Sequence, residues 1–122
     1  PGSTVVGTGV TVPWNTCCLW NLRRLSCLGF PLVGDASFEI SQSGVEEMTA
    51  IALHQYLYPT DCAAKLMEVP GIEWRTEFAG DPARRLQHER KMRLKVQRPR
   101  LQLGLLGLPE PRVLHLAAPL KS

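Results

Sequence analysis

Hydrophobic and polar residues alternate along some parts of the chain and recur every three or four positions along others. The segment from Thr4 to Pro13 is rich in β-branched residues and is interrupted by glycine, which is typical of one or two short strands. From Trp14 to Leu28, apolar residues lie three or four positions apart. This spacing predicts a short helix with Arg23 and Arg24 on its solvent side.

The middle of the chain has the pattern of a capped helix followed by a strand. Ser43 and Glu46 have the spacing of a capping box, in which each side chain accepts a hydrogen bond from a backbone N–H at the start of a helix. We therefore expect a helix that runs to about Leu57. Residues 72–78 alternate between apolar and charged side chains, which predicts a half-buried strand with Trp74 on its buried face.

The last third of the chain changes its period. Asp81 and Pro82 are typical of an N-cap and a first helical turn, so a helix is expected from Ala83 to about Arg90. Apolar and polar residues then alternate from Met92 to Leu105, which predicts strands, and a final strand is expected over residues 113–120. Together these elements predict one small α+β domain, with an antiparallel or mixed sheet and two or three helices.

Length and composition fit this fold. The 122 residues suffice for one domain with a single core. The hydrophobic share of 44% and the charged share of 20% are close to globular averages, which argues against a disordered tail or a coiled coil. No apolar run approaches the ~20 residues that span a bilayer, so no membrane partner is predicted. Because the first residue is proline, we expect residues 1–122 to be a single domain or a fragment of a larger protein.

Charge is segregated along the chain, although the net charge is only +3. Residues 35–81 contain nine acidic and two basic side chains, a net charge of −7, whereas residues 84–112 contain nine basic and two acidic ones, a net charge of +7. The two halves either pack together and screen each other, or present opposite faces. Arginine outnumbers lysine ten to four, and the planar guanidinium suits bidentate contacts with phosphate.

The basic half therefore supplies the candidate binding site. A helix would place Arg84, His88 and Lys91 along one line that could follow a nucleic-acid backbone. The candidate nucleic-acid-binding residues are Arg23, Arg24, Arg84, Arg85, Arg90, Lys91, Arg93, Lys95, Arg98 and Arg100.

Cysteine and histidine patterns predict no active site. The four cysteines include no C-x-x-C pair, so we expect mostly buried free thiols, with a disulfide or a metal site as alternatives. Free thiols suggest an intracellular, reducing compartment or the mitochondrion. The three histidines are scattered, and the adjacent Glu46 and Glu47 are expected to favour a helix start. No catalytic residue, metal ligand or cofactor is predicted.

Two segments carry a family resemblance. Residues 28–35, Leu-Gly-Phe-Pro-Leu-Val-Gly-Asp, resemble a loop of the RluA-type RNA pseudouridine synthases, and residues 100–120 look like the terminal pair of strands of that family. The resemblance implies that Arg23 or Arg24 contacts RNA and that Asp35 anchors the loop. The His-Arg-Leu-Asp motif with the family's catalytic aspartate is absent. The resemblance thus implies a C-terminal fragment or a non-catalytic descendant.

These observations favour a non-catalytic binding module for RNA or another polyanion. One alternative is a protein-interaction subunit that docks its opposite charges onto a larger assembly. A second is a fragment of an RNA-modifying enzyme whose catalytic part lies elsewhere. The salt dependence of binding distinguishes the polyanion-binding module from the protein-interaction subunit. Binding to RNA weakens steeply with salt, whereas binding through an apolar protein interface does not.

Overall fold

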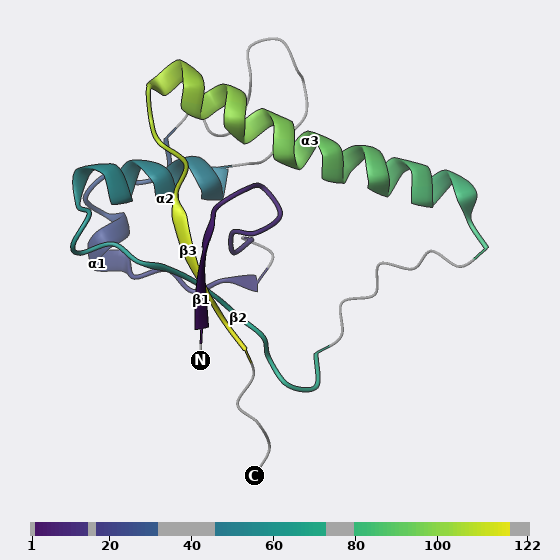
Figure 1. Cartoon of the computed structure of the whole chain (residues 1–122), viewed down its shortest axis with the longest axis horizontal. Coiled ribbons are helices and arrows are strands. Elements are labelled where there is room, and N and C mark those ends of the chain that lie inside the picture. Colours follow the sequence, from purple (N-terminus) through teal and green to yellow (C-terminus); the bar gives the residue numbers. More distant parts are fainter. Residues whose placement is uncertain (1, 15–16, 32–45, 73–79, 118–122) are drawn as a thin grey trace.

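A computed structural model of the chain describes residues 2–14, 17–31, 46–72 and 80–117 (Figure 1). Within these residues it contains three helices and a three-stranded mixed sheet, which confirms the predicted α+β class. The elements in chain order are β1 (Gly2–Val6), α1 (Leu22–Leu25), α2 (Glu46–Leu57), β2 (Ala64–Met67), α3 (Pro82–Leu106) and β3 (Arg112–Leu116).

The sheet joins the two ends of the described chain. Its order is β1-β3-β2, with β1 antiparallel and β2 parallel to the central strand β3. Val5 and Ala64 flank Val113, which is fully buried. The parallel pair requires a long crossover, and α3 supplies it between β2 and β3. The strands expected near both ends of the chain are confirmed, whereas β2 was not predicted.

The helix α2 runs to Leu57 as predicted, and it lies against the core. Met48, Ile51 and Ala52 on α2 pack in one buried cluster with Leu103 of α3 and Val113 of β3. Two polar contacts fix α2 in place. The Thr49 hydroxyl donates to the Gln102 side-chain oxygen at 3.0 Å, where both residues are buried. The Gln55 amide also exchanges two hydrogen bonds, of 2.8 and 2.9 Å, with the backbone of Arg112.

The helix α3 is longer than predicted. The strands expected between Met92 and Leu105 are wrong, because this segment continues the helix to Leu106. A helical stripe was present at Val96, Pro99 and Leu103, which are three and four positions apart, and the last two are buried against the rest of the protein. Leu101 and Leu105, which carried the alternating pattern, are exposed. Burial of the helical stripe therefore decides the structure of this segment, and the alternating pattern does not.

A turn after β1 holds the middle of α3. Pro99 has no N–H to donate to the carbonyl of Lys95 four residues earlier. The backbone of Gly9 lies against that carbonyl, so closely that a Cβ on Gly9 would overlap it. The Trp14 indole N–H donates to the Gly9 carbonyl at 2.9 Å. The Lys95 ammonium lies over the Trp14 ring, 3.7 Å from its centroid. We call these four residues the α3 junction.

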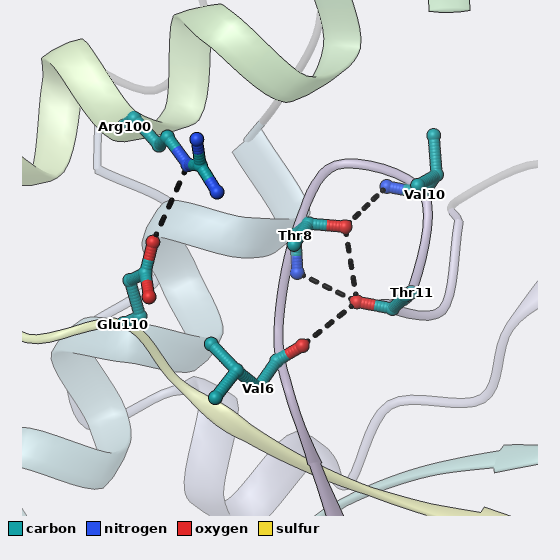
Figure 2. Close-up of polar contacts among 6 residues, drawn as sticks. All are labelled: Val6, Thr8, Val10, Thr11, Arg100 and Glu110. Atoms are coloured by element: carbon teal, nitrogen blue, oxygen red, sulfur yellow. Dashed lines mark hydrogen bonds and ion pairs between the residues drawn. The ribbon is translucent and has the colours of Figure 1, made fainter.

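Hydrogen bonds within the turn fix the position of Gly9 (Figure 2). The Thr8 backbone N–H donates to the Thr11 hydroxyl at 2.7 Å, and the two threonine hydroxyls lie 3.1 Å apart. The Thr11 hydroxyl donates to the Val6 carbonyl at 3.0 Å, and the Val10 N–H donates to the Thr8 hydroxyl at 3.3 Å. The turn is thus tied to the end of β1 before it meets α3.

Several other predictions concern residues outside the described part of the chain. These are the Ser43 cap, the strand with Trp74 and the loop residues from Leu32 to Asp35. The short helix α1 confirms the element predicted before that loop, with Arg23 and Arg24 exposed.

Substitution of Gly9 by alanine should destabilise the fold by about 1–3 kcal/mol, because the added methyl group overlaps the Lys95 backbone. Gly104→Ala is the matched control. It lies within α3 with nothing within 4 Å of an added Cβ, and should stabilise the protein by up to about 1 kcal/mol. Urea unfolding of the two variants measures the difference. A Gly9→Ala variant as stable as the unsubstituted protein would contradict the described junction.

Candidate polyanion-binding arm on helix α3

The helix α3 has two parts that differ in burial. Residues 82–93, which we call the arm, are all exposed except for the half-buried His88 and Met92. Residues 94–106, which we call the stem, contain all four buried residues of the helix, namely Arg98, Pro99, Gln102 and Leu103. Figure 1 shows the arm extending beyond the sheet and α2, in the darker green part of α3. The core therefore holds the stem and leaves the arm in solvent.

The start of the arm is built as predicted. The Asp81 side chain accepts a hydrogen bond from the Arg84 N–H at 3.0 Å, and Pro82 occupies the first turn. A carboxylate at this position also lies favourably at the positive end of the helix dipole. Asp81 thus supports the arm where the packed core does not reach.

The arm concentrates exposed positive charge. Its five cations are Arg84, Arg85, Arg90, Lys91 and Arg93, and its one acid is Glu89. Arg85 lies 3.7 Å from Glu89, in an exposed pair one helical turn apart. Exposed pairs of this kind contribute little to stability. Arg90, Lys91 and Arg93 form no ion pair within the described part of the chain.

The stem directs its positive charge inward or pairs it. Lys95 is half-buried over Trp14, and Arg98 is only 6% exposed. Burial lowers the pKa of the Lys95 ammonium below its ordinary value. Nearby Glu47 and Glu46 oppose this shift, and Lys91 adds to it. Arg100 pairs with Glu110 at 3.5 Å (Figure 2). The acidic start of α2 therefore screens part of the basic segment, as one of the two charge hypotheses expected.

The line predicted through Arg84, His88 and Lys91 changes its environment along α3. Arg84 and Lys91 are exposed and His88 is half-buried. Continued along the helix, the same line reaches Lys95 and then the buried Arg98 and Gln102. Lys95 and Arg98 therefore lie outside the exposed arm.

The two arginines on α1 lie apart from the arm. Figure 1 shows α1 and the arm on opposite sides of the molecule. Arg24 forms an ion pair with Asp61 at 3.1 Å, and Arg23 is exposed. The structure does not bring these residues together with the arm into one surface.

The cysteines and histidines offer no second site in the described residues. None of the four cysteines, all of which are described, forms a disulfide. The expectation that they are mostly buried is wrong, because Cys17 and Cys27 are exposed and the other two are half-buried. Burial raises the pKa of the Cys18 thiol. No group of three metal-ligating side chains occurs among the described residues. No described helix is both long and apolar enough to cross a membrane.

Comparisons with protein families, curated proteins and solved structures found no match to this chain. The segment that resembles the terminal strands of the pseudouridine synthases starts as helix, because residues 100–106 belong to α3. Among the described residues of this segment, which end at residue 117, only β3 forms a strand.

The sequence pattern did not predict the contact of Gly9 and Trp14 with α3. Two features of the sequence are consistent with this contact. A proline inside a helix leaves a carbonyl without its usual donor, and a glycine can approach such a group closely. The division of the arm from the stem also had a signal, because apolar residues at helical spacing begin only at Met92.

Replacement of Lys95 by methionine should leave the thermal stability at pH 7 unchanged or slightly higher. The folded-state pKa of Lys95 lies below the unfolded value, so the charged form is disfavoured by folding at pH 7. This cost begins to fall as the pH rises above the folded-state pKa, and it is gone above the unfolded-state pKa. Methionine keeps the contact with Trp14 and removes the charge. Trp14→Ala, the comparison variant, should lower the melting temperature because it removes packing against the core.

Thermal melts at pH 7 measure both variants. An equal loss of stability in Lys95→Met and Trp14→Ala would show that the cation over the ring, rather than the packing of the ring, holds the junction.

Proposed function

We propose that this chain is a non-catalytic binding module for RNA or another polyanion, and that it binds along the arm of α3. The observation that carries the proposal is the arm itself. Five exposed cations and one acid lie on a helix that extends beyond the packed core.

Three cations of the arm are available to a ligand, because Arg90, Lys91 and Arg93 are exposed and form no ion pair within the described residues. The acids of α2 act on Lys95, Glu110 pairs with Arg100, and the exposed Glu89 pairs with Arg85, so these acids do not screen the other cations of the arm directly. Guanidinium groups bind phosphate oxygens in bidentate geometry, and each phosphate contact releases bound counterions. A helix that is already capped at Asp81 presents these groups at fixed spacing.

Exposed leucines on α3 favour protein binding as a second candidate function. Leu101 and Leu105 are 60% and 77% exposed on the stem, and Leu86 is 63% exposed on the arm. An apolar contact through these leucines would make the chain a subunit of a larger assembly. Such binding would be insensitive to salt, which distinguishes it from binding to a polyanion.

The proposal predicts that a 20-nucleotide single-stranded RNA or heparin binds the protein with strong salt dependence. Fluorescence anisotropy against salt concentration measures this. The double variant Arg90→Gln and Arg93→Gln should weaken RNA binding and lower the slope of log affinity against log salt by about 1.4, at about 0.7 for each lost phosphate contact. Its melting temperature should not change, because both side chains are exposed and form no described ion pair.

The matched control is Lys65→Gln with Arg112→Gln, which removes the same charge from exposed positions on the sheet. Binding by this control should equal that of the unsubstituted protein. Equal losses in the two double variants would show that net charge alone attracts the RNA. Absence of binding to both RNA and heparin at low salt would contradict the proposed function.

A further inference from the structure

We infer that the polyanion bound by the arm is double-helical DNA, with the arm lying in the major groove. This inference rests on the proposed function and adds the class and shape of the ligand. Three features of the arm carry it: the distribution of its cations, the exposure of every side except the one with His88 and Met92, and its lack of aromatic residues other than His88.

The five cations surround the arm rather than form a stripe. At 3.6 residues per turn, with Arg84 as zero, Arg85 lies at about 100°, Arg93 at about 180°, Arg90 at about 240° and Lys91 at about 340°. A helix that lies on a flat surface directs only one side toward that surface, so the cations of the other side stay in water. A groove between two phosphate backbones places negative charge on both flanks, so Arg85 and Arg93 on one flank and Arg90 and Lys91 on the other can contact phosphate at the same time.

Within the described part of the chain, the surroundings of the arm leave room for such a groove. All of its residues except His88 and Met92 are exposed, and Figure 1 shows it extending beyond the sheet and α2. A helix with its side chains is about 10–12 Å across, which matches the ~12 Å width of the major groove of B-form DNA. The arm is about 18 Å long, at about 1.5 Å for each residue. It can therefore enter the groove while the stem keeps the sheet outside the duplex.

Other nucleic acids suit the arm less well. The major groove of A-form RNA is deep and narrow, and side chains do not read it. Proteins that bind single strands stack bases on aromatic side chains. The arm sequence, residues 82–93, contains no aromatic residue apart from the half-buried His88. Trp14 lies beside the C-terminal end of the arm, and the Lys95 ammonium lies over its ring. Contacts to the phosphates of a duplex are the mode that these residues allow.

The test compares labelled 20-base-pair duplexes of DNA and RNA with the corresponding single strands, at one salt concentration. The full chain should bind the DNA duplex at least tenfold more tightly than the RNA duplex or either single strand. Methyl green, which occupies the major groove, should displace the protein, whereas netropsin in the minor groove should not.

A pair of matched variants tests the groove geometry. Arg85→Gln with Arg93→Gln removes cations from one flank, and Arg90→Gln with Lys91→Gln removes them from the other. Each pair should lower the salt slope for duplex DNA by about 1.8, at about 0.9 for each contact. A lower salt slope in only one of the two double variants would show that the arm binds DNA with one side, and would overturn the inference that it lies in the groove.

The outcomes separate the two proposals. Equal or tighter binding to the RNA duplex or to single strands would overturn the choice of DNA and leave polyanion binding intact. Displacement by netropsin alone would place the arm in the minor groove and overturn the inference. Absence of binding to every nucleic acid and to heparin would overturn the inference and the proposed function together.

Discussion

The close approach of Gly9 to the carbonyl of Lys95 determines how this chain is arranged. Pro99 cannot donate to that carbonyl, and only a residue without a side chain can cover it at this distance. The turn that presents Gly9 is tied to β1, and β1 pairs with β3, the strand that follows α3. The first and last described elements thus hold the long helix at its middle. Trp14 strengthens the junction by binding the Gly9 carbonyl and packing under Lys95.

The contact between Gly9 and Lys95 divides α3 into a stem whose polar groups contact the protein and an arm whose cations are exposed. C-terminal to the junction, the polar groups of α3 are engaged by the protein: Gln102 is buried against Thr49, and the exposed Arg100 pairs with Glu110. N-terminal to it, the arm contains no buried residue, and its cations are exposed. An isolated helix of about 12 residues is marginally stable in water. The arm therefore depends on the stem for nucleation and on its Asp81 cap, and a bound polyanion would stabilise it further by neutralising repulsion among its like charges.

Local patterns predicted the elements that local chemistry controls. The cap at Asp81 and Pro82, the end of α2 near Leu57 and the two terminal strands follow from spacing and composition alone. The helix over residues 92–106 did not, because its apolar residues fit both periods and only contact with α2 decides between them. The parallel strand β2 has four residues and depends on pairing with β3, which lies far along the sequence. Charge segregation indicated the basic helix, but only the fold shows that Lys95 and Arg98 turn inward while Arg90 and Arg93 do not.

The central claim is that α3 is one helix with a docked stem and a free arm. Amide hydrogen exchange measured by NMR on the unliganded protein tests this directly. Apart from Pro99, which has no N–H, amides of the stem from Val96 to Leu106 should exchange as slowly as those of α2, because both open only when the core unfolds. Amides of the arm from Leu86 to Arg93 should exchange faster by orders of magnitude, because they open by fraying from Asp81. Uniform protection along the whole of α3 would contradict the account.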